Sequence, residues 1–291
     1  MRNSFAPCCD QVHLLSPDIQ LPIRGILVNS ATPAHHPQLH IDIRGQGPDL
    51  VILHGWGVNS AVFTPLHEQL SEYRVHYVDL PGFGLSQPIA GNLSTWVDAL
   101  IHALPANAIW AGWSLGGLVA TQAAISYPSH VKGLMTIASS PCFMAREEEA
   151  WPGIPPQVLS MFGEQLGQNL PKTIERFLAI QAMGSETAKD DIKQLRDLVL
   201  ARPLPDAAAL TQGLDMLNQI DLRPQLSAIQ QPWLRIWGRL DGLVPKRVQP
   251  KMPTASHITD VMLAKASHAP FVSHREEFVQ AITPWLAQFK D

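Results

Sequence analysis

The chain has 291 residues, of which 46% are hydrophobic and 16% charged, and its formal net charge is -4. This length suits one large α/β domain or two small domains. A slightly acidic chain has no general attraction for nucleic acid or acidic membranes, and no run of about 18 apolar residues predicts a membrane span. The three cysteines cannot form a disulfide framework, and residues 1–7 lack the apolar segment of a secretory signal. We therefore expect a cytoplasmic protein without nucleic-acid or membrane partners.

Short apolar segments beyond residue 38 have the pattern of strands. Residues 39–44 alternate apolar and polar side chains, as in a half-buried strand, whereas residues 50–53 form the continuous apolar run of a strand buried on both faces. Comparable runs recur at residues 75–78, 108–111, 134–138, 234–237 and 258–263. Helical patterns separate most of these runs, at residues 61–70, 96–104 and 118–127. Strands alternating with helices predict an α/β fold, with a mostly parallel central sheet and helices on both faces.

Two segments depart from this alternation. Residues 1–37 are rich in Pro, Ser and Asn without sustained periodicity, and we interpret them as a flexible N-terminal extension. Residues 146–221 contain no convincing strand but several helical patterns punctuated by prolines. A helical insertion at this position is typical of a cap over an active site. We therefore expect a core made of residues 38–145 and 222–291, with residues 146–221 inserted as the cap.

The sharpest chemical signal is Gly-Trp-Ser-Leu-Gly-Gly at residues 112–117. It follows the predicted strand 108–111 and precedes the predicted helix 118–127, which is the context of a Gly-x-Ser-x-Gly nucleophile elbow. In such a turn the serine hydroxyl projects above the sheet near a helix N-terminus, whose free amides suit a developing oxyanion. The bare pattern also occurs by chance in turns, and its position between strand and helix favours the functional interpretation. We predict that Ser114 is a nucleophile.

A second motif, His-Gly-Trp-Gly at residues 54–57, follows the predicted strand 50–53. In the fold that a nucleophile elbow indicates, the loop after an early strand supplies one backbone N–H of the oxyanion hole, and the residue after the nucleophile supplies the other. We therefore expect Trp56 and Leu115 to serve through their main-chain amides. His54 is an alternative catalytic base, but its position favours a hydrogen bond that organises the loop.

The remaining catalytic groups follow from chain order, which in this fold is serine, then aspartate or glutamate, then histidine. Asp79 ends a predicted strand but precedes Ser114, so we interpret its loop as structural. Asp241 and His268 each follow a later predicted strand and would lie at the same sheet edge as Ser114. We expect His268 to take the serine proton and Asp241 to orient the imidazole.

Several motifs resemble the α/β-hydrolase superfamily and, within it, the carboxylesterase family of the biotin pathway. They are LHGWG at 53–57, VDLPGFG at 78–84, GWSLGGLVA at 112–120, ASSPCF at 138–143, WPGI at 151–154, ERFLA at 175–179 and LDGLVP at 240–245. The resemblance extends from about residue 39 to the end of the chain and includes the expected cap. It implies hydrolysis of a pimeloyl methyl ester carried by acyl carrier protein, which yields methanol and the free carboxylate.

The same resemblance implies that Trp56, Leu115, Phe177 and Gln181 line the substrate pocket. For Phe177 the alternative is an ordinary core position in a cap helix. The sequence shows no spacing of metal ligands, and we expect neither a metal nor another cofactor.

Acyl carrier protein is acidic, so its docking surface should be basic. Lys172 and Arg176 lie at i and i+4 of one helical pattern, and Lys189 and Lys193 have the same spacing, followed by Arg196, in another. We predict that both helices present positive charge to the carrier protein. The alternative is a solvated face in which these cations pair locally with neighbouring aspartates. Members of this family tend to use more arginine here, and lysine lacks the bidentate contacts of arginine.

Two other functions stay open at this point. One is a general short-chain carboxylesterase or carbon–carbon bond hydrolase with the same triad. The other, from a different class, is a small-molecule receptor of this fold with little turnover. We expect a monomer, while the preferred acyl-chain length is not predicted by any pattern in the sequence.

Overall fold

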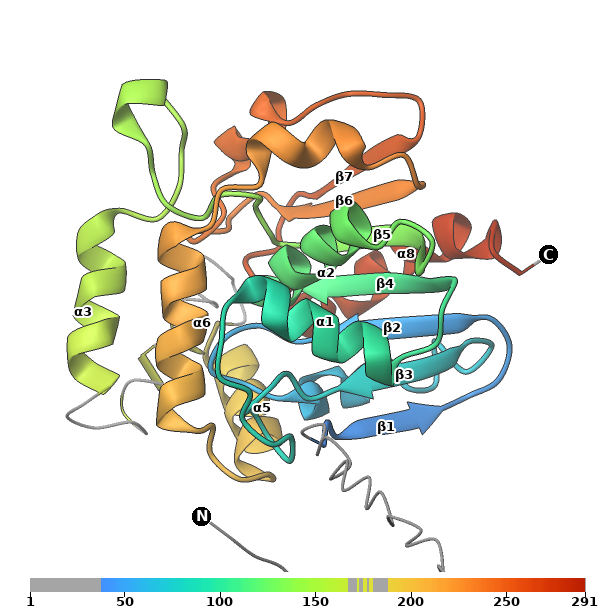
Figure 1. Cartoon of the computed structure of the whole chain (residues 1–291), viewed down its shortest axis with the longest axis horizontal. Coiled ribbons are helices and arrows are strands. Elements are labelled where there is room, and N and C mark those ends of the chain that lie inside the picture. The colour runs from blue at the N-terminus through green and yellow to red at the C-terminus, as the bar shows by residue number, and fades with distance from the viewer. Residues whose placement is uncertain (1–37, 167–171, 173–174, 177, 180–187, 291) are drawn as a thin grey trace, which may run out of the picture. The chain divides into compact units, whose positions relative to one another are not determined.

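The computed structural model describes residues 38–166, 172, 175–176, 178–179 and 188–290. Within these residues lies a seven-stranded sheet in the order β1-β3-β2-β4-β5-β6-β7 (Figure 1). The strands are β1 Ile41–Arg44, β2 Asp49–Leu53, β3 Arg74–Val78, β4 Ala108–Trp113, β5 Val131–Ile137, β6 Trp233–Gly238 and β7 Ile258–Leu263. β1 pairs antiparallel with β3, and the other neighbours are parallel. The structure confirms the expected mostly parallel sheet.

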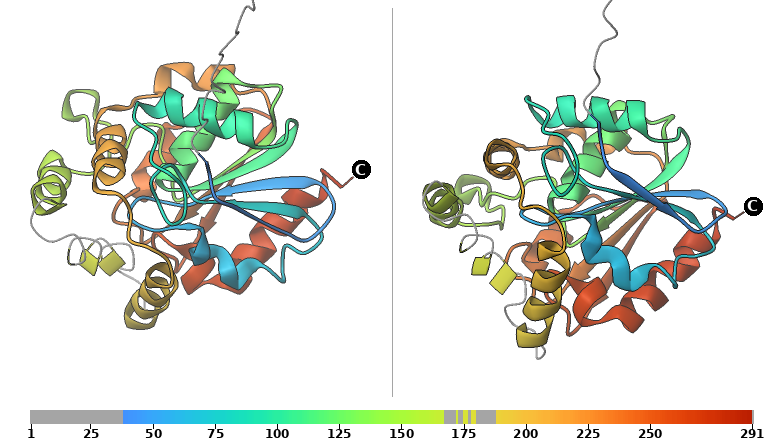
Figure 2. Two further views of the ribbon diagram at one scale, coloured as in Figure 1. Left: turned by 60° about the horizontal axis from the view of Figure 1, so that its bottom comes forward. Right: turned by 90° about the horizontal axis from the view of Figure 1, so that it is seen from below.

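Helices cover both faces of the sheet (Figure 2). The α-helices are α1 Leu93–Ala103, α2 Leu115–Ser126, α3 Pro156–Leu166, α5 Ala188–Leu200, α6 Ala207–Gln219, α7 Pro270–Ser273 and α8 Arg275–Ala287. The 3₁₀ helices are η1 Ser60–Leu66, η2 Glu147–Glu149, η3 Arg223–Ala228 and η4 Lys246–Lys251. None of these helices, in the part of the chain that the structure describes, is long and apolar enough to cross a membrane.

The two faces of β2 show why its sequence is continuously apolar. Val51 and Leu53 point into a core cluster that contains side chains of α1 and α2. Leu50 and Ile52 point into a second cluster that contains side chains of η1 and α8. Successive residues of a strand face opposite sides of the sheet, so a strand covered on both faces needs apolar side chains throughout.

The segment after β2 is shorter and tighter than the sequence predicted. In place of an α-helix over residues 61–70, the chain forms the 3₁₀ helix η1 and then a series of turns that lead to β3. Asn59 caps η1 by accepting the N–H of Ala61 through its side chain. Pro65 lies inside the segment and has no N–H to continue an α-helical ladder, which accounts for the early end.

The described part of segment 146–221 includes η2, α3, α5 and α6, with two isolated bridges, Met144 with Ile154 and Arg146 with Trp151, near its start. These helices lie beside the C-terminal ends of the parallel strands (Figure 1). Contacts confirm this placement for α6, because the indole of Trp56, in the loop after β2, donates to the Leu210 carbonyl. The expected extension 1–37 lies outside the described residues.

Candidate active site

Ser114 stands at the turn between β4 and α2 with φ 53° and ψ -119°, a conformation that residues other than glycine rarely adopt. Hydrogen bonds to β5 and to Ser139, which follows it, hold the turn. The Ser114 N–H donates to the Ile137 carbonyl at 3.0 Å, and the Ser139 hydroxyl donates to the Ser114 carbonyl at 2.8 Å. Backbone strain of this kind persists only where the surroundings fix it, and it occurs often at active sites. The geometry is that of a nucleophile elbow.

Glycines on both sides of Ser114 allow the turn to be this tight. A Cβ atom on Gly112 would collide with the carbonyl of Gly116, and one on Gly116 would collide with the carbonyls of Leu53 and His54. α2 therefore starts in close contact with the end of β2. The N–H groups of Gly117 and Leu118 donate to the Ser114 carbonyl, at 2.9 Å and 3.2 Å. Those of Leu115 and Gly116, at the very start of the helix, have no acceptor within it.

The imidazole of His268 lies between Ser114 and Asp241. Its Nε2 is 2.9 Å from Ser114 Oγ, and its Nδ1 is 2.8 Å from Asp241 Oδ2. Since a carboxylate only accepts hydrogen bonds, Nδ1–H donates to Asp241, which leaves Nε2 to accept the serine O–H. The other oxygen, Asp241 Oδ1, accepts the N–H groups of Leu243 at 2.8 Å and Val244 at 2.9 Å. The three residues have the arrangement of a Ser-His-Asp triad.

Contacts between loops set the spacing of this array. The loop that carries Asp241 is bound to the loop that carries His268 by the Leu240 N–H, which donates to the Ala266 carbonyl at 3.0 Å. The Trp113 indole N–H donates to the His268 carbonyl at 2.7 Å and so joins the histidine loop to β4. These bonds connect the loop of Asp241 to the loop of His268, and the loop of His268 to the end of β4, where Ser114 follows.

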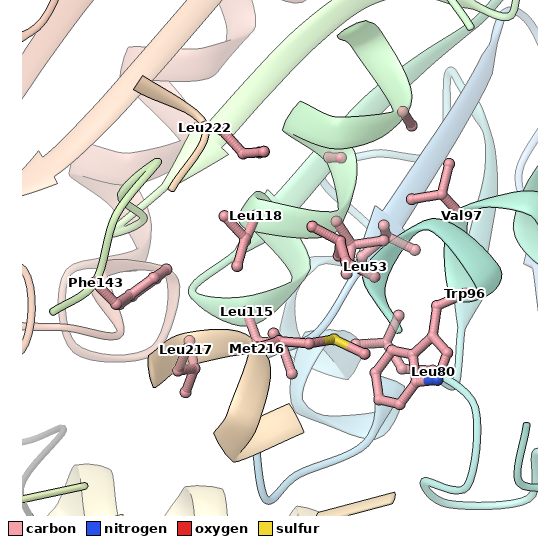
Figure 3. Close-up of a cluster of buried hydrophobic side chains, with 14 of the residues drawn as sticks. Leu53, Leu80, Trp96, Val97, Leu115, Leu118, Phe143, Met216, Leu217 and Leu222 are labelled. Carbon is pink, nitrogen blue, oxygen red and sulfur yellow. The ribbon is translucent and has the colours of Figure 1, made fainter. Parts of the chain in front are cut away.

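The site is buried beneath apolar side chains. Ser114 is 3% exposed and His268 is 0% exposed. Figure 3 shows Leu115 of α2 close to Met216 of α6, in a cluster that also includes Phe143 and Leu217. Leu115, the residue that follows Ser114, is thus packed among apolar side chains that include those of α6.

The expected oxyanion loop lies directly beside the nucleophile. A Cβ atom on Gly55 would be 3.2 Å from Ser114 Cβ, so only a residue without a side chain fits the loop there without a shift. The next residue is Trp56, and Leu115 is the first residue of α2. Both side chains are 0% exposed. Both residues are therefore chain neighbours of residues at this point, Trp56 of Gly55 and Leu115 of Ser114, while their role as oxyanion donors stays a prediction.

His54 organises the loop, as the sequence analysis favoured. Its Nδ1 is 2.7 Å from the Gly55 carbonyl, and its Nε2 accepts the N–H of Leu80 at 2.9 Å. Both ring nitrogens are therefore engaged with backbone groups, which fits the neutral tautomer protonated on Nδ1. Complete burial lowers the pKa of His54 to about 4, which is consistent with a neutral ring.

Asp79 also has the structural role that its position in the chain suggested. Its carboxylate accepts the N–H of Ser60 at 2.8 Å and the N–H of Leu85 at 2.9 Å. It is also paired with Arg202, which follows α5. His268 instead contacts Asp241.

The predicted docking residues lie on exposed surface where they are described. Lys172, Arg176, Lys189 and Lys193 are all exposed. On α5, Leu195 and Val199 are 1% exposed and belong to the core, so the helix has an apolar inner face. Arg196 forms an ion pair with its neighbour Asp197 at 3.3 Å, which is local pairing of the kind left open as an alternative. Phe177 and Gln181, the two substrate-pocket candidates from the cap, lie outside the described residues.

The residues that support Ser114 and His268 through hydrogen bonds to their backbone carbonyls were not predicted from the sequence. Trp113 and Ser139 are the clearest cases, and both are buried. Ser139 follows β5, the strand adjacent to β4, so its place after a predicted strand was the available signal. The partner atoms become apparent only once strand order is known. No group of three or more His, Cys, Asp or Glu side chains within the described residues could hold a metal ion.

Comparisons with known proteins agree with this geometry. A family model described as the alpha/beta hydrolase fold matches residues 48–275. The pimeloyl-[acyl-carrier protein] methyl ester esterase of Shewanella sp. (strain MR-7) is 94% identical over 264 residues, covering 91% of this chain and 100% of that protein. The protein of the same name from Aeromonas hydrophila is 53% identical over 247 residues, covering 82% of this chain and 95% of that protein.

Solved structures show the same fold. An esterase from Exiguobacterium antarcticum matches with a TM-score of 0.77 at 22% identity, covering 86% of this chain and 96% of that chain. An enol-lactonase from Burkholderia xenovorans matches with a TM-score of 0.75 at 18% identity, covering 87% and 98%. At these identities the likeness concerns the fold alone. The sequence relatives are much nearer, and the chain belongs to the α/β-hydrolase fold family and, within it, to the pimeloyl-[acyl-carrier protein] methyl ester esterases.

Proposed function

We propose that this protein hydrolyses the methyl ester of pimeloyl-[acyl-carrier protein], releasing pimeloyl-[acyl-carrier protein] and methanol for biotin biosynthesis. The observation that carries the chemistry is the contact of 2.9 Å between His268 Nε2 and Ser114 Oγ, with Asp241 behind the imidazole. The substrate is supported by the name of a relative that is 94% identical over its full length.

In the proposed reaction, Ser114 Oγ attacks the ester carbonyl while His268 Nε2 takes the hydroxyl proton. The negative charge that develops on the carbonyl oxygen is stabilised by the main-chain N–H groups of Trp56 and Leu115. His268 then protonates the departing methoxide, which leaves an acyl group on Ser114 and releases methanol. A water molecule, deprotonated by the same imidazole, hydrolyses this ester and restores the serine. The reaction needs no metal and no cofactor.

The acyl chain is proposed to lie between the core and segment 146–221, which acts as the cap. Trp56 and Leu115 contribute from the core side, and Phe177 and Gln181 contribute from the cap by resemblance to the family. The apolar contact of α6 with Leu115 supports a pocket for a hydrocarbon chain.

The carrier protein is proposed to dock on the cap through Lys172, Arg176, Lys189 and Lys193. Their exposure supports the proposal, because a basic surface attracts an acidic partner and speeds association. The proposal keeps the expectation of a monomer in the cytoplasm.

A comparison of substrates tests this assignment. We expect kcat/KM for the carrier-bound methyl ester to exceed that for dimethyl pimelate by at least about tenfold. Dimethyl pimelate has the same acyl chain but a second methyl ester in place of the carrier. Equal ratios, with fast cleavage of p-nitrophenyl butyrate, would instead indicate a general esterase. Negligible turnover of all three, with a rise in Tm on adding ester, would indicate a receptor.

A further inference from the structure

Helix α6 lies against the side chains of both residues assigned to the oxyanion hole. A Cβ atom on Gly213 would be 2.8 Å from Cδ1 of Trp56 and 3.1 Å from Cδ2 of Leu115. Cβ atoms in proteins essentially never approach another heavy atom within 3.0 Å, so the first contact excludes any residue larger than glycine without a shift. The backbone of α6 itself is therefore the surface on which these two side chains rest.

A hydrogen bond fixes the Trp56 ring at a second point on the same helix. Its indole N–H donates to the Leu210 carbonyl at 2.8 Å, one turn before Gly213. The ring is thus held at its N–H by Leu210 and at its Cδ1 edge by Gly213. Because an indole is rigid and joined to its backbone by only two rotatable bonds, fixing the ring restricts the main-chain N–H of Trp56.

The helix that supplies this support is tied to the core at both ends. At its start the Asp206 N–H donates to the Gly82 carbonyl at 2.8 Å, while the Asp206 side chain caps α6. Beyond its end the Leu222 N–H donates to the Pro141 carbonyl at 2.9 Å. A helix anchored in this way resists displacement, so an added methyl group at position 213 acts mainly on the side chains that face it.

We infer that Gly213 is a positioning residue, through which the cap helix α6 holds the two backbone donors of the oxyanion hole in place. The inference rests on the proposed roles of Trp56 and Leu115. It goes beyond them because it assigns the cap a part in the chemical step as well as in covering the substrate. Catalytic donors must be held within a fraction of an ångström of the productive geometry, so a small shift of either amide lowers the rate.

The variant Gly213→Ala tests the inference, and Gly163→Ala is its matched control. Both substitutions replace a glycine in a helix of segment 146–221, and both raise helix propensity. A Cβ on Gly163, however, would meet one atom, Leu214 Cδ2, at the ordinary distance of 3.6 Å. With p-nitrophenyl butyrate we expect Gly213→Ala to lower kcat at least about tenfold with KM within about twofold of wild type, and Gly163→Ala to leave both unchanged.

A transition-state analogue separates this role from a merely structural one. An aliphatic trifluoromethyl ketone adds to the serine and places an oxyanion where the ester oxyanion forms. If Gly213 positions the donors, the inhibition constant of the ketone rises by the same factor as kcat/KM falls. A fall in kcat without weaker ketone binding would overturn the inference, as would a folded Gly213→Ala protein with wild-type kcat.

Trp56→Phe provides a second test, since it keeps an aromatic side chain, though a smaller one, and removes the N–H that binds Leu210. We expect kcat and the affinity for the ketone to fall by similar factors in Trp56→Phe. In the double variant with Gly213→Ala, the fall in kcat should be smaller than the product of the falls in the two single variants. Unchanged kcat and ketone affinity in Trp56→Phe would contradict the inference even if Gly213→Ala failed to fold. These assays use only small ligands. If the protein failed to hydrolyse the carrier-bound ester, the proposed substrate would be wrong, but the role of Gly213 would still be tested separately.

Discussion

The carboxylate of Asp79 and the guanidinium of Arg202 lie 2.8 Å apart. Asp79 belongs to the core, and Arg202 belongs to the inserted helical segment 146–221. The Asp79 side chain is 0% exposed and that of Arg202 is 18% exposed. The same carboxylate accepts the N–H of Ser60, the first residue of η1, and the N–H of Leu85. One buried charge therefore joins the start of η1, the loop after β3 and the end of α5.

Removing this cation should destabilise the protein strongly. Arg202→Met leaves the Asp79 carboxylate buried without its counter-charge, and breaking a buried pair in this way costs roughly 3 kcal/mol. The control is Arg196→Met, which removes the pair with Asp197, in which the side chains are 43% and 55% exposed. Exposed pairs contribute about 0–1 kcal/mol. Urea unfolding measures both, and equal losses would show that Arg202 does not form a buried pair in solution.

Stability should also fall in mild acid because of His54. Burial lowers the pKa of its imidazole to about 4 in the folded chain, from 6.5 for an unperturbed histidine. Between these values the unfolded chain binds a proton that the folded chain does not, so the stabilising contribution is complete above about pH 6.5 and is lost as the pH falls towards 4. The size is on the order of 3 kcal/mol.

The contribution of His54 to the pH dependence of stability can be measured by urea unfolding of wild type and His54→Asn at several pH values from 7 to 4.5. We expect the free energy of unfolding of the variant to be lower at pH 7 but less dependent on pH. The same pH dependence in both proteins would mean that His54 is protonated in the folded state or that it is solvated.

The role of Asp241 predicts a large kinetic effect with little change in structure. In Asp241→Asn the side-chain amide can donate to Nδ1, which favours the wrong imidazole tautomer, and comparable changes lower kcat about 10⁴-fold. Asp215→Asn, at an exposed position of α6, is the control and should retain the rate. Steady-state kinetics with p-nitrophenyl butyrate measure kcat of both variants. A fall in kcat of less than about tenfold in Asp241→Asn would contradict its role in the triad.

The docking proposal predicts an effect confined to carrier-bound substrate. Reversing charge at Arg176, Lys189 and Lys193 together should raise KM for the carrier-bound ester at least about tenfold and leave KM for dimethyl pimelate unchanged. The effect should diminish at high salt, because exposed charges are screened.

The control for docking reverses three exposed cations outside the cap, Lys251, Lys265 and Arg275. It changes the net charge equally, so a general electrostatic effect would appear in both variants. Loss of carrier-dependent activity in the control alone would place the docking surface on the core.

Much of the core was predictable because its signals are local. The apolar runs of β2 and β4 and the glycines around Ser114 depend only on neighbouring residues and on burial. The 3₁₀ form of η1 was not predicted, because apolar periodicity outweighed the effect of Pro65 in that interpretation. A fully buried Arg235 within β6 was equally hard to foresee, since its partner Asp260 lies on the adjacent strand.

Contacts between the core and α6 or Arg202 were not predictable from the sequence. Trp56 and Leu210 are 154 residues apart, and Asp79 and Arg202 are 123 apart. No pattern of spacing relates such residues, because the pairing depends on where the inserted helices meet the sheet edge. The proximity of Ser114, Asp241 and His268 was predictable only because their chain order and their places at strand ends are characteristic of the fold.

The most direct test of the account measures methanol released from pimeloyl-[acyl-carrier protein] methyl ester by wild type and by Ser114→Ala. The account predicts rapid release of one methanol per carrier by the wild type and a rate lower by at least about 10³-fold in the variant. Release at a similar rate by the variant would contradict Ser114 as the nucleophile. No release by a wild-type protein that still cleaves p-nitrophenyl esters would contradict the proposed substrate.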